Sequence, residues 1–207
     1  LKIPMKGSAS FSFGSTMHNT LCAFYTKMQE LNRATQTSLF SAPVPRDPEG
    51  LARVPTLDEL MSLYESKWIS DWYESKFQRE TYYEKGKEIL KIFYASHDGH
   101  WRVPVSLEGW FKIKVGDVTM RGRIDRVDQA EDGTLEVIDY KTGASKEKLE
   151  GDEKDQLLLY QIAVQTLSEY RHLGSVEKLT FYYLNDNIQT SFVGTSQELE
   201  KLKGKLS

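Results

Sequence analysis

The sequence predicts a mixed α/β (α+β) domain, in which a mixed central sheet is flanked by helices and preceded by an N-terminal helical region. Apolar residues recur every three or four positions over roughly the first half of the chain, as in amphipathic helices. From Val103 the period changes, and short runs of β-branched and aromatic residues alternate with glycine-containing turns, as in strands. A further helical run separates the later strands, and this order is typical of α+β or mixed α/β domains.

Length and composition favour a soluble globular chain with one domain spanning 1–207. Of its 207 residues, 39% are hydrophobic and 28% are charged, a balance too apolar for disorder and too polar for a membrane protein. No run approaches the roughly 18 apolar residues of a membrane span. The single cysteine, Cys22, excludes an internal disulfide and a complete iron–sulfur cluster in this chain and fits a reducing, cytoplasmic compartment. Because the chain starts with Leu1, we expect a fragment of a longer protein.

Helices are predicted throughout the N-terminal half, at 15–33, at about 56–77 and at 80–94. Ser15 is a good N-cap for the first, and Thr56 with Glu59 forms a capping-box pattern for the second. Four of the six prolines lie in 34–55, which predicts a flexible loop, and we expect a helical insertion over 56–98. The aromatic residues of this region could stack on bases, but their helical spacing favours the core: Trp68, Trp72, Tyr73, Phe77, Tyr82 and Tyr83.

The core sheet and its helix are expected over 103–193. Predicted strands cover 103–107, 110–115, 118–127, 135–141, 178–184 and 188–193. A helix at 152–170 lies between the fourth and fifth of these strands, and a last helix begins at Ser196. Gly116 and Gly133 mark tight turns, so the strands around each should form antiparallel hairpins.

The hairpin around Gly133 brings charged residues together. Pairing about this turn sets Asp125 opposite or nearly opposite Asp139, with Cβ atoms roughly 5 Å apart. Lys141 follows Asp139 by two residues, so both project from the same face of the strand. Two carboxylates at that distance repel each other unless a cation lies between them or one is protonated, and a hard divalent cation is the common solution. Such a face suits metal-dependent phosphodiester hydrolysis, in which Lys141 orients the water or stabilises phosphate charge.

Four ordered motifs resemble those of the PD-(D/E)XK nuclease superfamily, in the branch that contains the RecB and AddB nuclease domains. They are Gly14-Ser15-Thr16-Met17-His18, Gly122-x-x-Asp125-Arg126, Ile138-Asp139-Tyr140-Lys141-Thr142-Gly143 and Gln156-Leu157-Leu158-Leu159-Tyr160. The first is similar to the GxxxH motif of that branch, the next two to its motifs II and III, and the last to its QxxxY motif. The run SFGSTMHNTLCAFY most resembles nuclease domains at the C-terminal end of UvrD/Rep-like helicases.

The resemblance implies a restriction-endonuclease-like core and a role for each matching residue. Asp125, Asp139 and Lys141 are expected to be catalytic. A Mg²⁺ or Mn²⁺ ion would be held by both aspartates, by His18 and by the backbone carbonyl of Tyr140. Many relatives also carry four cysteines for an iron–sulfur cluster, and none of those positions exists here. Either the protein lacks the cluster, or the sequence is a fragment cut inside it.

Substrate contacts are expected from Gln156 and Tyr160, which share one helix face and by resemblance contact the DNA backbone or brace the lysine. Arg123 and Arg126 could contact phosphate or pair with Asp128. Glu108 could extend the carboxylate cluster or be a solvated strand-end charge.

Structural alternatives stand beside these roles. The charges of the hairpin could be ordinary surface charges, His18 could be a half-buried histidine of an amphipathic helix, and Gln156 with Tyr160 could serve packing alone.

The expected function is that of a metal-dependent DNA nuclease, most simply an exonuclease on single-stranded or unwound ends within a helicase–nuclease of DNA repair or recombination. Alternatives are a non-catalytic DNA-binding or scaffold module of a helicase and an RNA nuclease. A net charge of −3 by itself argues against a nucleic-acid partner. It is compatible with a catalytic module to which a helicase delivers DNA.

Overall fold

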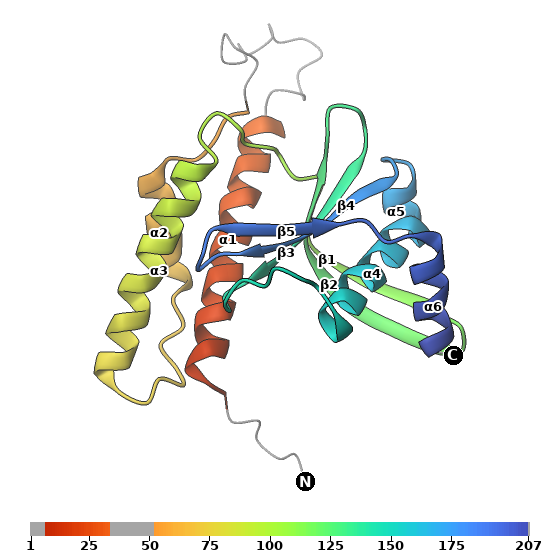
Figure 1. Ribbon diagram of the computed structural model, residues 1–207. Helices are drawn as coiled ribbons and strands as arrows, with labels where there is room; N and C mark the ends of the chain where they lie inside the picture. The colour runs from red at the N-terminus through yellow and green to blue at the C-terminus, as the bar shows by residue number, and fades with distance from the viewer. Residues whose placement is uncertain (1–6, 34–51, 207) are drawn as a thin grey trace, which may run out of the picture. The chain divides into compact units, whose positions relative to one another are not determined.

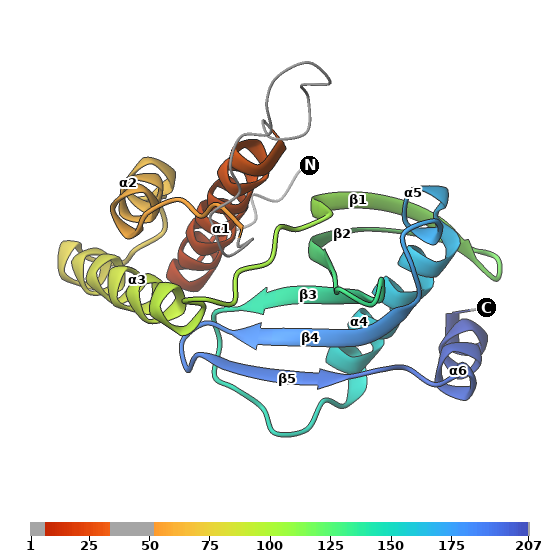
Figure 2. The same cartoon turned by 90° about the horizontal axis from the view of Figure 1, so that it is seen from above.

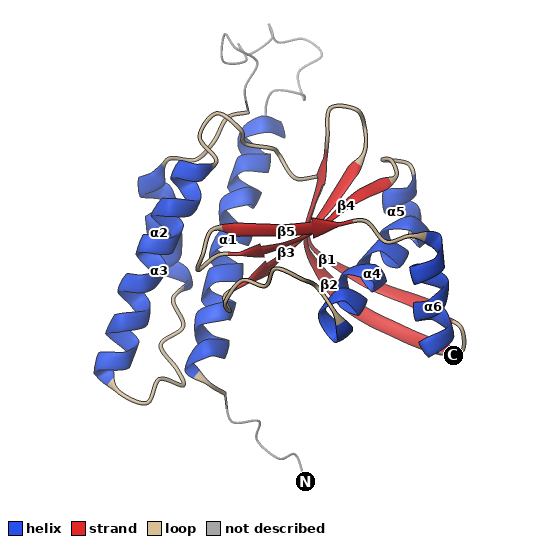
Figure 3. Cartoon of the chain, viewed as in Figure 1, coloured by secondary structure: helices blue, strands red, loops and turns tan. Residues whose placement is uncertain are grey.

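A computed structural model describes residues 7–33 and 52–206, and the chain divides into two compact units, Leu1–Val103 and Pro104–Ser207. The described part of the first is helical and that of the second combines a sheet with helices (Figure 3). The helices are α1 (Ala9–Arg33), α2 (Leu57–Lys67), α3 (Lys76–Ser96), α4 (Gly151–Thr166), α5 (Ser168–Arg171) and α6 (Ser196–Leu206). The strands are β1 (Ser106–Val115), β2 (Val118–Gln129), β3 (Leu135–Lys141), β4 (Val176–Tyr183) and β5 (Ile188–Phe192).

In the first unit, α1, α2 and α3 pack against one another (Figure 1). The expected start of α1 at Ser15 is wrong, because the helix begins at Ala9 and the Ser8 hydroxyl accepts the Phe11 N–H at 3.2 Å. The capping box of Thr56 and Glu59 is confirmed. Most of the predicted loop at 34–55 lies outside the described residues.

The helix expected over 56–77 is interrupted, since α2 ends at Lys67 and α3 begins only after the N-cap Ser75. Between them the chain folds back, so that Trp68 stacks on Tyr73 with ring centroids 5.5 Å apart. This packing explains why aromatic residues continue at helical spacing through a segment without helix. Trp72 and Phe77, by contrast, are 50% and 79% exposed, so the expectation that the aromatic series lies in the core is wrong for these two residues.

The second unit confirms the predicted mixed α/β class. Its sheet has the order β1-β2-β3-β4-β5, in which β3 and β4 are parallel and the other neighbouring pairs are antiparallel (Figure 2). The two strands expected at 103–107 and 110–115 form the single strand β1. The helix expected at 152–170 is divided into α4 and α5 by Leu167, whose backbone is extended.

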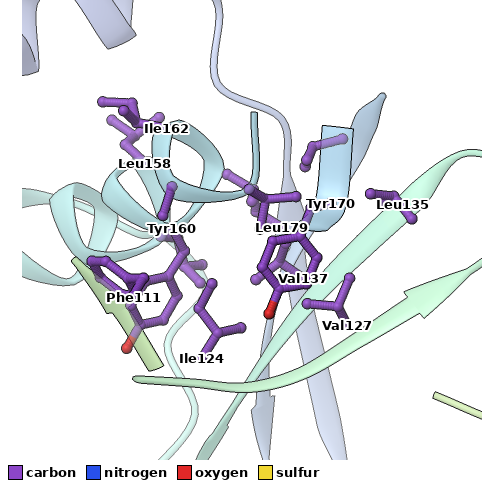
Figure 4. Packing of buried hydrophobic residues seen from close by; sticks show 14 of the residues in the cluster. Phe111, Ile124, Val127, Leu135, Val137, Leu158, Tyr160, Ile162, Tyr170 and Leu179 are labelled. Atoms are coloured by element: carbon purple, nitrogen blue, oxygen red, sulfur yellow. The ribbon is translucent and has the colours of Figure 1, made fainter. Parts of the chain in front are cut away.

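A hydrophobic core joins α4 to the sheet (Figure 4). Leu158 and Ile162 of α4 belong to the same buried cluster as Val137 and Leu179 of the central strands. The ring of Tyr160 packs edge-on against Phe111 of β1, with centroids 5.8 Å apart. This packing fixes the rotation of α4 and thereby directs one of its polar faces toward β3.

Candidate active site

Three acidic residues occupy opposite positions on three neighbouring strands. The pairing of Arg126 with Ile138, continued by one step, sets Asp125 opposite Asp139 as the sequence predicts. On the other side of β2, the flanking pairs with β1 set Glu108 opposite Asp125. Asp125 and Asp139 are buried, with 7% and 3% of their surfaces exposed. A row of acids at such depth needs positive charge or hydrogen-bond donors around it.

Glu108 joins this row through an unusual backbone conformation. Its φ of 50° lies in the left-handed region, which for a residue with a side chain costs about 1–3 kcal/mol. Carboxylate oxygens of Glu108 and Asp125 lie within 4.8 Å of each other, and Arg123 Nε lies 2.5 Å from Glu108 Oε2. Glu108 is therefore part of the acidic row and not a solvated strand-end charge.

Asp139 is the centre of a polar network that joins β3 to α4. The Lys141 ammonium lies 2.6 Å from Asp139 Oδ2 and donates to Gln156 Oε1 at 3.1 Å. The Gln156 amide in turn donates to Asp139 Oδ1 at 3.0 Å and to the Tyr160 hydroxyl at 2.8 Å. The predicted common face of Asp139 and Lys141 is confirmed, and α4 braces both side chains.

Two further donors hold the aspartates in place. The backbone N–H of Tyr140 donates to Asp125 Oδ2 at 2.9 Å, and the Tyr160 hydroxyl lies 3.4 Å from Asp139 Oδ1. Burial, followed by the charge of Asp139, raises the pKa of Tyr160. The phenol therefore keeps its proton at neutral pH and remains a donor toward the carboxylate.

Gly122 stands where a side chain would collide with a ring. It pairs with Phe111 of β1, and a Cβ added at Gly122 would meet the Phe111 ring at 2.5 Å. The same ring packs on Tyr160. The glycine thus lets Phe111 lie flat over β2 and support the helix that carries Gln156.

The model of the PD-(D/E)XK nuclease superfamily matches residues 2–207. This chain belongs to the PD-(D/E)XK nuclease superfamily. No curated protein matches it in sequence. Among the described residues, no helix combines the length and apolar character needed to cross a membrane.

In this chain, the acidic row offers the donor set that a hard divalent cation prefers. Superfamily members use divalent metals, and Glu108, Asp125 and Asp139 supply carboxylate oxygens from adjacent strands. Oxygen ligands of this kind suit Mg²⁺ or Mn²⁺. The strained backbone of Glu108 is a second sign of such a site, because local strain of this kind clusters at functional positions.

Arg123 and Arg126, the two arginines of β2 expected to contact phosphate or Asp128, have different partners. Arg126 forms two parallel hydrogen bonds to Asp128, with nitrogen–oxygen distances of 2.6 and 2.5 Å, and also donates to the Tyr140 hydroxyl at 3.2 Å. Arg123 pairs with Glu108 and remains exposed on the outer face of β2. Of the two predicted alternatives, pairing with Asp128 thus applies to Arg126, and Arg123 is left beside the acidic row.

His18 lies on α1, in the first unit of the chain, and is partly buried. Its role as a metal ligand stays a prediction, as does that of the Tyr140 carbonyl. Sequence reasoning missed Trp110, which follows Glu108 by two residues on β1 and is 74% exposed. A single tryptophan in a predicted strand indicates a core residue, and only the strand pairing shows that Trp110 faces outward.

Proposed function

We propose that the chain is a Mg²⁺- or Mn²⁺-dependent deoxyribonuclease that acts as an exonuclease on single-stranded or unwound DNA ends. The observation that carries this proposal is the row of Glu108, Asp125 and Asp139 across three strands, with the Lys141 ammonium 2.6 Å from Asp139. Motif resemblance adds a helicase domain in the same parent chain or complex, and a role in repair or recombination.

In this proposal Asp125 and Asp139 hold the metal, together with His18 and the Tyr140 carbonyl, and Glu108 extends the same set. The bound ion would supply Lewis-acid polarisation of the phosphate and a lowered pKa of its water. The aspartates are held for this task by donors of the chain itself, the Tyr140 N–H on one and the Gln156 amide on the other.

Lys141 supplies the mobile positive charge of the site. Its ammonium is partly exposed, with 27% of the side chain accessible, and is shared between Asp139 and Gln156. A compact ammonium with three donors can keep one of these contacts while it turns another toward an attacking water or a phosphate oxygen. Gln156 and Tyr160 limit its movement, and Arg123 can contact a neighbouring phosphate.

The proposal is tested by incubating the purified chain with end-labelled single- and double-stranded DNA in Mg²⁺, Mn²⁺ or EDTA. We expect metal-dependent cleavage that begins at single-stranded ends. Asp125→Asn and Lys141→Met should each lower the rate at least about a hundredfold, as loss of one preorganised charge does in other sites. Asp98→Asn, an exposed acid of the first unit, is the matched control.

Undiminished cleavage by either active-site variant would contradict the proposal. Binding of DNA without hydrolysis in any metal would instead identify a non-catalytic module. Equal cleavage of a matched RNA strand would remove the restriction to DNA.

A further inference from the structure

The outer face of the β1–β2 hairpin carries basic side chains around one exposed tryptophan. The hairpin lies at one edge of the sheet (Figure 2). Along β1, residues alternate between the buried Phe111, Ile113 and Val115 and exposed neighbours. The register pairs those neighbours with exposed residues of β2. The resulting set, here called the hairpin strip, consists of Trp110, Lys112, Lys114, Arg121 and Arg123.

The hairpin strip adjoins the acidic row. Trp110 pairs across the strands with Arg123, whose guanidinium lies 5.7 Å from the centroid of its ring. Arg123 also pairs with Glu108. The last basic residue of the strip is thus in contact with the first carboxylate of the candidate active site, and the two surfaces form one continuous path.

The exposed position of the Trp110 ring contributes little to the stability of the fold. Its ring is 74% exposed, although burying a large aromatic side chain stabilises a protein by about 2–3 kcal/mol. The guanidinium of Arg123 covers it in part, and this orients the indole without enclosing it. An oriented, accessible ring is suited to stacking on a nucleic-acid base, a contact worth about 1–3 kcal/mol per base.

Positive charge is much denser on the hairpin strip than over the chain as a whole. Four of its five residues are cationic, whereas the whole protein has a net charge of −3. Asp117 at the turn is 4.0 Å from Lys114 and 97% exposed, so it neutralises little in water. From Trp110 to Lys114 the strip extends about 14 Å, the length of about four stacked nucleotides.

We propose that the hairpin strip binds a single strand of the nucleic-acid substrate and leads it to the acidic row. Trp110 stacks on an unpaired base while Lys112, Lys114 and Arg121 contact phosphates. A single strand is favoured over a duplex because a protruding ring can stack only on a base whose face is free. This inference rests on the proposed nuclease function and adds the surface that binds the single strand.

Binding of the full chain to fluorescein-labelled oligo(dT) and to a duplex of equal length, measured by anisotropy in EDTA, tests the strip without cleavage. Trp110→Ala should raise the Kd for oligo(dT) about 5- to 100-fold and change duplex binding much less. The combined variant Lys112→Gln, Lys114→Gln, Arg121→Gln should reduce the slope of log Kd against log salt by about 2.

Matched controls are Phe77→Ala, an equally exposed aromatic residue of α3, and Lys91→Gln on the same helix. Both should bind as the unchanged protein does. Thermal unfolding followed by circular dichroism checks that each variant folds. Unchanged oligo(dT) binding by both strip variants, or equal losses for single strand and duplex with Trp110→Ala, would overturn the inference.

Cleavage assays separate this inference from the proposed function. If the protein binds oligo(dT) through Trp110 but cleaves nothing with Mn²⁺, the strip stands and the nuclease proposal fails. If Trp110→Ala cleaves limiting oligo(dT) as fast as the unchanged protein, the nuclease stands and the strip is overturned.

Discussion

Asp125 and Asp128 lie three residues apart on β2, and both are buried, yet they have opposite electrostatic surroundings. Asp128 is 2% exposed and receives two hydrogen bonds from the guanidinium of Arg126. Asp125 is 7% exposed, has a carboxylate oxygen of Glu108 within 4.8 Å, and lies opposite Asp139 in the strand register. Burial alone therefore does not tell a structural acid from a functional one. The groups beside each acid distinguish these two aspartates.

The pair of Arg126 and Asp128 is complete within the protein. Its two parallel bonds satisfy both carboxylate oxygens, and the remaining arginine nitrogen donates to the Tyr140 hydroxyl. Removing one partner from such a pair strongly destabilises the fold, because the other charge stays buried without compensation. The acidic row behaves differently. Its carboxylates repel one another, and this repulsion is relieved when a charge is removed or a cation is added.

The largest expected effect is the loss of Asp128. Asp128→Asn should lower the free energy of unfolding by about 3 kcal/mol, because it leaves the buried guanidinium of Arg126 without its counter-charge. Urea unfolding at pH 7 measures this change. The double variant Arg126→Met, Asp128→Leu should recover most of it, since apolar residues can replace a buried pair. A single variant as stable as the unchanged protein would show that the pair is dispensable.

The matched substitution at Asp125 should act in the opposite direction. Asp125→Asn removes one charge from the row and keeps an oxygen that can accept the Tyr140 N–H. We expect stability to rise by about 1 kcal/mol, as is common when a functional site is neutralised, while cleavage is lost. Side-by-side urea unfolding of the two variants provides the comparison. Destabilisation of similar size in both would remove the distinction between the two acids.

The smallest effect concerns an ion pair on the surface. Hydrogen bonds from Lys154 first, then from the backbone and side chain of Thr195, lower the pKa of Glu198 from 4.5 to about 2. Because the pKa is lower in the folded state, the pair stabilises the protein above about pH 4.5, and this contribution disappears as the pH falls toward 2. Both side chains are one-third exposed, so the contribution is below about 1 kcal/mol.

Glu198→Gln should thus lower the free energy of unfolding slightly at pH 7 and leave it unchanged near pH 2. Urea unfolding at both pH values measures this difference. Glu200→Gln, which removes an exposed neighbour on the same helix, is the control. A difference between Glu198→Gln and the unchanged protein that grows on acidification would contradict the assigned sign.

The net charge of the chain conceals a local basic surface, and the fold explains why. A net charge of −3 averages over the whole chain. Strand pairing, however, places Lys112 opposite Arg121 and Trp110 opposite Arg123 on one exposed face. The alternation of the hairpin, with buried Phe111 and Ile113 between them, creates a local basic surface on an acidic protein.

Local periodicity was enough to determine much of the site. The common face of Asp139 and Lys141 follows from the two-residue repeat of a strand, and the register of Asp125 with Asp139 follows from the turn at Gly133. The capping box at Thr56 is equally local. Each of these features depends only on neighbours in sequence or on one short turn, and each was predicted correctly.

Only the tertiary structure decided the partners of these residues. Gln156 reaches Asp139 because α4 packs on the sheet through Phe111 and Tyr160. The spacing of residues in the sequence does not predict this packing. Glu108 joins the row because β1 pairs with β2 and the backbone at Glu108 is left-handed. The break between α2 and α3 depends likewise on Trp68 stacking against Tyr73. Side-chain periodicity sets which face a residue occupies, whereas non-local packing selects what it meets there.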